Sequence, residues 1–280
     1  MRWWGKLLFG AGLAGVTSLL VRDRDAAARA VVAGASLAFP WLIDGLYHQT
    51  HGPEAVLLFV SDTHGGPGSE RALVAKLQAE DAVDAFLHGG DIVDGELGAE
   101  GWAVRWDAAF RAVPGPWYAA SGNHDVETAE GLAAFHARFG RLPRAVRVGS
   151  VDVFLLPWNH GAGSAAWLAE RVQAGGARWR VLVTHRPLWS VKEGGSDDAA
   201  SIERLRPALS KIDLVLSGHE HVRAVLEREV DGHRIRQVVE VSGPKHYACG
   251  TSPECVSGES GYTRIVAYED ELRLDRVVAE

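Results

Sequence analysis

The chain has 280 residues, of which 47% are apolar and 23% charged, a composition that excludes a disordered protein, a collagen-like protein and a disulfide-rich scaffold. A single hydrophobic core stops growing at roughly 250–300 residues, so the length favours one large domain with an appendage. The 29 Lys and Arg residues are outnumbered by 36 Asp and Glu residues, a formal charge of −7, so no basic excess indicates a nucleic-acid partner.

The first 50 residues contain two apolar stretches, residues 7–21 and 26–43, separated by four charged residues. Both stretches are shorter than the about 20 apolar residues that a membrane-spanning helix needs, and the second contains Arg29. We expect residues 1–50 to form an uncleaved hydrophobic anchor, either single-pass or a helical hairpin, that associates the protein with a membrane. The alternative is a soluble helical pair packed on the domain that follows, residues 51–280.

From residue 51 onwards, short apolar runs typical of strands alternate with segments of helical period, which indicates an α/β domain. The predicted strands are residues 56–60, 85–88, 117–120, 151–156, 181–184 and 214–217. The predicted helices between them are residues 70–80, 102–113, 129–139, 165–173 and 201–209. Residues 222–229, 233–241, 262–268 and 272–278 then follow as consecutive strands, which predicts a meander that closes a second sheet.

A long loop rich in Gly and Ser, residues 243–261, interrupts these last strands and contains both cysteines, Cys249 and Cys255. Such a pair forms a disulfide only if the domain faces an oxidising compartment. Basic residues lie at both ends of the first apolar stretch, so they do not decide the membrane orientation. We favour a domain outside the cytoplasm, and the thiol state and the oligomeric state stay open.

Five predicted strands are each followed within a few residues by side chains that can bind a metal ion. In chain order these are Asp62 and His64, then Asp91, then Asn123, then His185, then His219 and His221. The carboxyl ends of the strands in an open α/β sheet share one rim, so the five loops can converge on one site. Four imidazoles, two carboxylates and one amide oxygen suit Mn²⁺, Fe or Zn²⁺ better than Ca²⁺ or Mg²⁺.

The motifs that carry these side chains are Asp62-x-His64, Gly90-Asp91, Gly122-Asn123-His124-Asp125, Thr184-His185 and Gly218-His219-x-His221. In this order they resemble the signature of the calcineurin-like metallophosphoesterase family, over residues 55–278. The resemblance implies a four-layer α/β/β/α sandwich of two mixed sheets. Residues 167–172 and 178–187 are most similar to the purple acid phosphatase branch, but Asp94 stands where that branch has a tyrosine ligand, so no ferric-tyrosinate centre is expected.

The resemblance also implies two divalent metal ions bridged by the carboxylate of Asp91. The other ligands would divide between the two ions as Asp62, His64 and His221 for one, and Asn123, His185 and His219 for the other. A paired site of this kind polarises the phosphoryl oxygens and generates hydroxide for attack on phosphorus. In the family pattern, His124 donates a proton to the leaving oxygen and Asp125 orients its ring.

The predicted activity is therefore hydrolysis of a phosphate ester, by a phosphatase or a phosphodiesterase, with the choice between monoester and diester left open. One alternative is a pyrophosphohydrolase that acts on a lipid-linked nucleotide. Another is a catalytically silent scaffold of the same fold, although such proteins usually lose ligands that this chain retains.

Several neighbouring residues have two interpretations. Arg186 either neutralises the substrate phosphate or forms a surface ion pair. Asp94 either hydrogen-bonds a metal ligand or caps a helix. Lys245, His246 and Tyr247 open the long loop and are candidates for shaping the substrate pocket.

Overall fold

The computed structural model describes residues 52–279 except 65–67, 69, 96 and 97. The predicted anchor, residues 1–50, lies outside the described residues and stays a prediction. From Glu54 onwards the chain forms one compact unit. Within the part of the chain that the structure describes, no helix combines the length and the apolar character needed to cross a bilayer.

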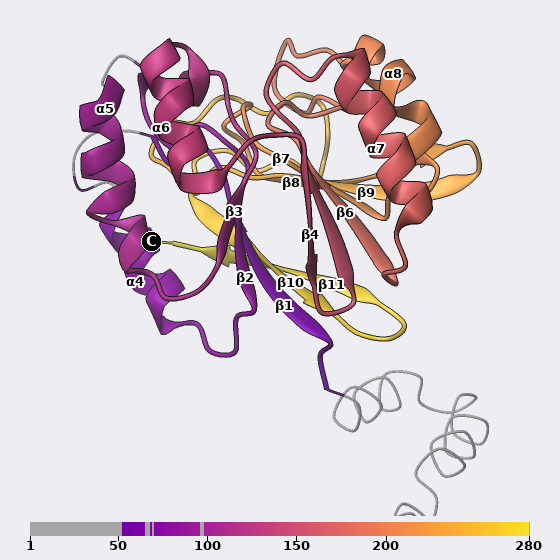
Figure 1. Cartoon of the computed structure of the whole chain (residues 1–280), viewed down its shortest axis with the longest axis horizontal. Helices are drawn as coiled ribbons and strands as arrows, with labels where there is room; N and C mark the ends of the chain where they lie inside the picture. The colour runs from indigo at the N-terminus through magenta and orange to yellow at the C-terminus, as the bar shows by residue number, and fades with distance from the viewer. Residues whose placement is uncertain (1–51, 65–67, 69, 96–97, 280) are drawn as a thin grey trace, which may run out of the picture. The chain divides into compact units, whose positions relative to one another are not determined.

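Two mixed sheets form the centre of this unit (Figure 1). The first sheet has the order β11 (Leu272–Val278), β10 (Gly261–Ala267), β1 (Ala55–Val60), β2 (Ala85–His88) and β3 (Trp117–Ala119). The second has the order β4 (Arg144–Val148), β5 (Val151–Leu155), β6 (Trp179–Val183), β7 (Leu214–Ser217), β9 (His233–Val239) and β8 (Ala224–Val230). In each sheet the strands next to the site are parallel to one another, and antiparallel strands complete the edges.

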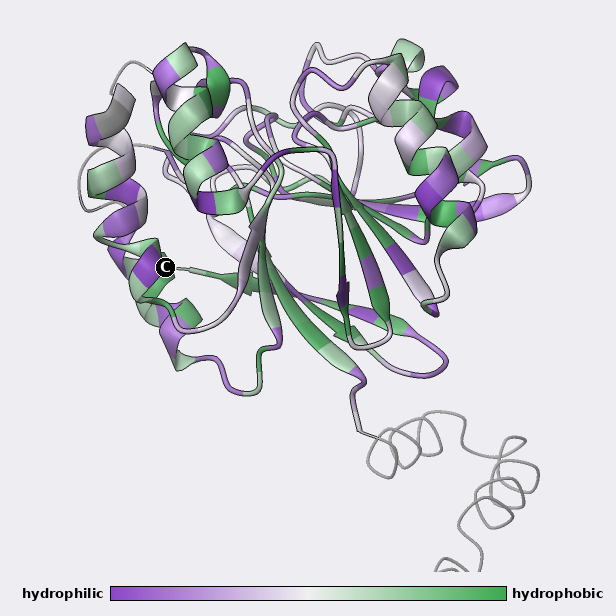
Figure 2. Ribbon diagram, viewed as in Figure 1, coloured by the Kyte–Doolittle hydropathy of each residue, from purple (hydrophilic) through white to green (hydrophobic). Residues whose placement is uncertain are grey.

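The two sheets pack face to face because the side chains of each strand alternate between its faces. In β1, Leu57 and Phe59 join the core between the sheets, together with apolar residues of β5, β6 and β7. Leu58 and Val60 point the other way and pack against the helices that cover the first sheet. The strands of both sheets are accordingly mostly hydrophobic, whereas the helices mix both kinds of residue (Figure 2).

Helices cover the outer face of each sheet. The first sheet is covered by α4 (Arg71–Ala79), α6 (Ala129–Phe139) and the π-helical turn η2 (Trp102–Asp107), which follows α5 (Gly98–Gly101). The second is covered by α7 (Ala162–Ala174) and α8 (Ala199–Leu209). The predicted four-layer α/β/β/α sandwich of two mixed sheets is therefore confirmed (Figure 1).

The predicted C-terminal meander is wrong, because the four last strands belong to two different sheets. β8 and β9 form a hairpin at the edge of the second sheet, whereas β10 and β11 pair with each other and with β1 in the first. The long loop between β9 and β10 crosses from one sheet to the other. β1 thereby gains the antiparallel neighbour that satisfies its outer backbone groups.

Two local predictions also need correction. Residues 102–113 are not one helix. They form the π-helical turn η2 and then the short 3₁₀ helix η3 (Phe110–Ala112). The buried rings of Trp102, Trp106 and Phe110 lie along this segment and pack in the core under it. The edge strand β4 was missed because its two arginines interrupt the apolar pattern that marks the buried strands.

A buried ion pair ties the two sheets together. Arg223, just before β8, donates to Glu240, just after β9, with Nε 2.6 Å from Oε1. Both side chains are 1% exposed. Glu240 also accepts from the hydroxyl of Thr263 on β10, and Arg223 donates to the carbonyl oxygen of Val277 on β11. These contacts join the second sheet to the first directly after the loop that contains His219 and His221.

Candidate metal centre

The structure brings all seven predicted ligands to the rim where the parallel strands of both sheets end. The loops after β1, β2 and β3 carry Asp62, His64, Asp91 and Asn123, and the loops after β6 and β7 carry His185, His219 and His221. The ligand atoms form two groups, each within 4.8 Å: Asp62 with His64 and His221, and Asp91 with His185 and His219. Each group thus combines residues of both sheets.

The backbone is strained at four of these residues. Asp62, Asp91, His219 and His221 have φ values of 51°, 55°, 65° and 51°, in the left-handed region that disfavours residues with a side chain. Only two other described non-glycine residues share this conformation. Strain of this kind persists where the surroundings enforce it, and it concentrates at functional sites.

Two glycines of the sequence motifs make room for ligand carboxylates. A Cβ on Gly122 would lie 2.0 Å from Oδ1 of Asp91, and a Cβ on Gly218 would lie 2.0 Å from Oδ2 of Asp62. Both distances are far shorter than a van der Waals contact. The glycines that precede Asn123 and His219 are therefore required by the packing of the neighbouring loops.

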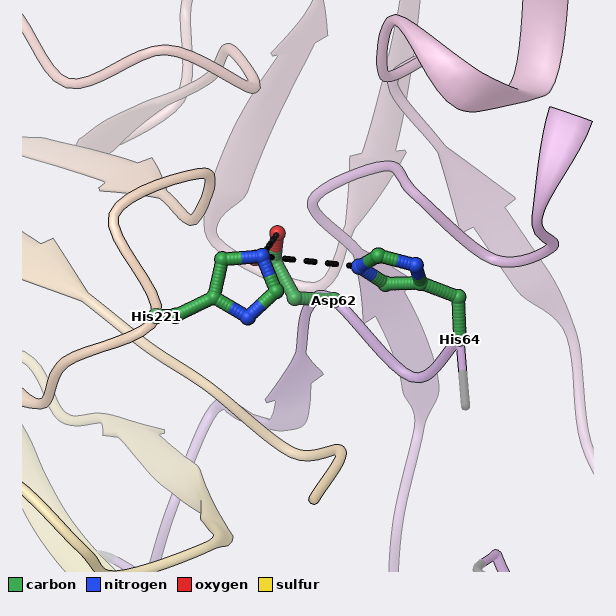
Figure 3. A group of neighbouring side chains, drawn as sticks. All are labelled: Asp62, His64 and His221. Carbon is green, nitrogen blue, oxygen red and sulfur yellow. Dashed lines mark hydrogen bonds and ion pairs between the residues drawn. The ribbon is translucent and has the colours of Figure 1, made fainter. Parts of the chain in front are cut away.

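The first group points three ligand atoms at one another (Figure 3). Nε2 of His64 lies 3.4 Å from Nε2 of His221, which lies 3.6 Å from Oδ1 of Asp62. The other oxygen of Asp62 accepts hydrogen bonds from the Ser61 hydroxyl and the His219 backbone N–H, both at 2.8 Å. The carboxylate is thus held through Oδ2, and Oδ1 faces the two imidazoles.

In three of the four imidazoles, the far nitrogen is fixed by a hydrogen-bond acceptor. Nδ1 of His64 lies 2.6 Å from Oδ1 of Asp94, Nδ1 of His221 lies 3.0 Å from the carbonyl oxygen of Lys245, and Nδ1 of His185 lies 2.9 Å from that of Gly89. Because a carbonyl or carboxylate oxygen only accepts, these Nδ1 atoms carry the proton. With the proton on Nδ1, Nε2 is the nitrogen that faces the centre, as in metal-binding histidines.

The second group contains a close pair of opposite charges. Nε2 of His185 lies 3.1 Å from Oδ2 of Asp91, and both residues are buried. Burial alone would lower the pKa of His185, but the carboxylates of Asp91 and Asp62 outweigh it and raise this pKa to about 9. The positive charge that the buried carboxylates require therefore falls on His185, and a divalent cation would supply it more fully.

Burial also shifts the pKa values of three other ligands. It raises the pKa of Asp62 to about 7, against the opposing effect of His185. It lowers the pKa of His219 to about 3 and that of His221 to about 4. Both rings are therefore neutral at ordinary pH, which is the form that binds a metal ion.

Two buried oxygen atoms of the site have no hydrogen-bond donor. They are Oδ1 of Asp62 and Oδ1 of Asn123, on the loops after β1 and β3. A buried polar atom without a partner costs about 1–3 kcal/mol, so such atoms need a compensating ligand. Free oxygens beside inward-facing imidazole lone pairs fit divalent cations, and the donor set suits a transition metal.

The family model for calcineurin-like phosphoesterases matches residues 55–223. The chain belongs to this family. The match runs from β1 to the loop after β7 and therefore includes all seven predicted ligands. No curated protein sequence matches the chain.

Solved structures of similar fold come from proteins with different roles. One is GAP50, described as the anchor in the inner membrane complex of Plasmodium, with a TM-score of 0.63 and 12% identity, covering 81% of this chain and 85% of that chain. PhoD has a TM-score of 0.58 and 12% identity, covering 81% and 69%. The sulfate thiohydrolase SoxB of Thermus thermophilus has a TM-score of 0.51 and 17% identity, covering 81% and 57%. At these identities the similarities establish the fold alone.

The predicted role of Asp125 in orienting His124 is contradicted by its hydrogen bonds. In this calcineurin-like phosphoesterase, Oδ2 of Asp125 accepts from the backbone N–H groups of Asp91 and Gly122, each at 2.8 Å. Oδ1 accepts from Ile92 at 2.8 Å and Val93 at 3.3 Å. Both oxygens thus accept hydrogen bonds from the loop after β2. Asp125 therefore positions Asp91 rather than the ring of His124.

His124 lies beside the two groups but belongs to neither. Its ring centroid is 5.0 Å from that of His64, and its backbone N–H donates to Oδ1 of Asp91 at 2.9 Å. Its Nδ1 lies 3.9 Å from Oε2 of Glu127, the residue that follows η4 (His124–Val126). The sequence analysis did not identify Glu127 as a partner of His124, although a spacing of three residues can indicate such a contact.

Two further residues around the ligands were also missed. The ring of Trp158 lies over two of them, with centroids 5.4 Å from His185 and 5.1 Å from His219. The carboxylate of Glu220, between His219 and His221, accepts from the hydroxyl of Ser190 and from the backbone N–H of Val191 at 2.8 Å. Nothing in the sequence pattern around either residue distinguishes it from an ordinary loop residue.

The structure gives both Asp94 and Arg186 a polar partner. Asp94 hydrogen-bonds the ligand His64, which agrees with the first of its two interpretations. Arg186 is about half-exposed, at 48%, and lies 3.9 Å from Asp198 at the start of α8. This is the surface ion pair.

We expect Asp94→Ala to weaken metal binding by the first group. The substitution removes the acceptor that fixes Nδ1 of His64, and the loss of such a partner typically costs about 10–100-fold in metal affinity. Asp94→Asn retains an acceptor oxygen and should lose less. Calorimetric titration of chelator-treated protein with Mn²⁺ or Zn²⁺ measures the change.

The matched control is Asp275→Ala on β11, which removes a carboxylate from a surface pair with Arg273. Its metal affinity should equal that of the wild type. An unchanged affinity in Asp94→Ala, or an equal loss in the control, would contradict the role of Asp94.

Proposed function

We propose that the protein hydrolyses phosphate esters with the help of two divalent metal ions. The observation that carries the proposal is the pair of ligand groups in one buried site, each built from both sheets, with imidazole lone pairs and unpaired carboxylate and amide oxygens facing inward. Membership of the calcineurin-like phosphoesterase family supports the reaction class.

Asp62, His64 and His221 would hold one ion, and Asn123, His185 and His219 the other, with Asp91 shared between them. When bound, the ions would supply positive charge to the phosphoryl oxygens and lower the pKa of a water molecule. Mn²⁺, Fe and Zn²⁺ fit this mixed set of nitrogen and oxygen ligands. Asp94, which takes the place of a tyrosine, is engaged with His64, which supports a centre without tyrosinate.

His124 is the proposed proton donor to the leaving oxygen. Its side chain is 35% exposed, so it reaches the solvent side of the site where a substrate arrives. Nδ1 faces Glu127, which leaves Nε2 as the nitrogen that would deliver the proton. Asp125 contributes as a positioning residue, because its four backbone hydrogen bonds set the loop that carries Asp91.

Replacing Asp91 should affect metal binding more broadly than replacing His64. Asp91→Asn removes the carboxylate that is shared between the two ions, so both positions should lose occupancy. His64→Ala removes a ligand of one ion only, and the other ion should remain. Elemental analysis of each variant after gel filtration measures the number of ions per chain.

Retention of two ions by both variants would contradict the ligand assignment. The same measurement separates the enzyme from a catalytically silent scaffold. A wild-type protein that retains no ion after reconstitution with Mn²⁺ or Zn²⁺ would favour the scaffold.

His124→Ala should slow the hydrolysis of esters with poor leaving groups selectively. A general acid contributes typically about 10²–10⁴-fold, and the contribution grows with the basicity of the leaving oxygen. We expect a steep fall in kcat for an alkyl phosphate and a much smaller fall for 4-nitrophenyl phosphate, with both metal ions retained. An equal loss on both substrates, or loss of metal, would assign His124 a structural role.

We also propose that residues 1–50 attach the domain to a membrane, with the domain outside the cytoplasm. The disulfide between Cys249 and Cys255 supports this orientation, because such bonds persist in oxidising compartments. Alkylation of thiols in freshly lysed producing cells should label neither cysteine. Labelling of both would place the domain in a reducing compartment.

A further inference from the structure

Two lysines and a tyrosine lie at the edge of the candidate metal centre and have no part in the mechanism above. The ring centroid of Tyr247 is 5.0 Å from that of the ligand His221. Nζ of Lys192 lies 5.5 Å from the centroid of the Tyr247 ring, and Nζ of Lys245 lies 5.2 Å from it. Cations at these distances are attracted by the aromatic ring, so Tyr247 favours positions of both ammonium groups beside the centre.

The backbone around these residues is tied to the ligand loop after β7. The N–H of Tyr247 donates to the carbonyl oxygen of His221 at 3.1 Å, and the carbonyl oxygen of Lys245 accepts from Nδ1 of the same histidine. On the other side, Glu220 accepts from the backbone N–H of Lys192 at 3.2 Å. Lys192 also forms an isolated β-bridge with Cys249, which the disulfide links to Cys255.

The two ammonium groups have no acidic partner at close range. Among the residues that the structure describes, neither lysine has a carboxylate within 4.0 Å. A hydrogen bond with Tyr247 raises the pKa of Lys245, so this side chain stays charged. The charge of Lys192 also acts on the ligand His219, where it helps burial to lower the imidazole pKa. The charge of Lys245 likewise acts on the ligand His221, so two positive charges lie beside the candidate metal centre.

We infer that Lys192 and Lys245, held by Tyr247, bind a second phosphate group of the substrate next to the phosphate that is hydrolysed. The inference rests on the proposed function and narrows its substrate class to diphosphates. Lysine ammonium groups bind phosphate as point charges. Two of them therefore suit a negatively charged second phosphate better than an uncharged leaving group.

The reaction on such a substrate is hydrolysis of a phosphoric anhydride. The oxygen of a water molecule forms a bond to one phosphorus and loses a proton to the solvent, and the bond between that phosphorus and the bridging oxygen breaks. The second phosphate leaves with the electron pair of the broken bond, and the two lysines stabilise its charge. No oxidant, reductant or further reactant is needed.

Binding of two non-hydrolysable probes to the Mn²⁺-loaded protein tests the inference. Methylenediphosphonate carries two phosphonate groups and methylphosphonate carries one. We expect Lys192→Met and Lys245→Met each to weaken the binding of methylenediphosphonate about tenfold, the loss that one charged hydrogen bond represents. The binding of methylphosphonate should change less than about twofold, because that probe does not reach the lysines.

The controls separate this effect from a general loss of charge. Lys211→Met removes the same charge from an exposed position after α8 and should bind both probes like the wild type. Lys245→Arg keeps the charge and should retain most of the affinity for methylenediphosphonate. Equal weakening of both probes in the two lysine variants, or no weakening of either, would overturn the inference.

A third probe tests the chemistry of the second group. Phosphonoacetate replaces one phosphonate by a carboxylate, and we expect it to bind more weakly than methylenediphosphonate. Equal affinity would overturn the assignment to diphosphates. Hydrolysis of 4-nitrophenyl phosphate by the wild type is measured separately, so a failure of the proposed function is distinguished from a failure of probe binding.

Discussion

The candidate site depends on the buried carboxylate of Asp125, which accepts hydrogen bonds from four backbone N–H groups of the loops after β2 and β3. These bonds fix the left-handed backbone of Asp91 and bring Gly122 against its side chain. Burial and the charge of Asp91 raise the pKa of Asp125 to about 6. A carboxylate in this position is tolerated because the four donors replace its lost hydration. The neighbouring residues His124 and Asp125 thus have different roles, since Asp125 positions a ligand loop and His124 is the proposed proton donor.

The division of the ligands between the two sheets makes the site a product of the whole fold. Asp62 and His64 come from the first sheet and meet His221 from the second, while Asp91 meets His185 and His219 in the same way. The apolar core between the sheets and the Arg223–Glu240 pair set the distance between these halves. Because neither sheet alone holds a complete group, a bound metal ion and the packing of the sheets would stabilise each other.

The sequence was most informative where local signals suffice. The strands β2, β7 and β11 lie at their predicted residues, and the seven ligands follow strands as expected, because polar residues after a buried apolar run stand out locally. The sheet to which each of the last four strands belongs could not be predicted in this way, because it depends on contacts between residues far apart in the chain. The same holds for Asp125, whose partners are backbone groups that no sequence pattern marks.

The loop between β9 and β10 carries two of the side chains proposed to bind the substrate and also contacts the candidate ligand His221. Its backbone at Lys245 fixes the tautomer of His221, while the side chains of Lys245 and Tyr247 stand beside the same ring. Side chains of this loop can change without moving the carbonyl oxygen that His221 needs. Under the proposed assignment, substrate preference could vary within the fold while the ligand set stays constant, because the two functions would use different atoms of one segment.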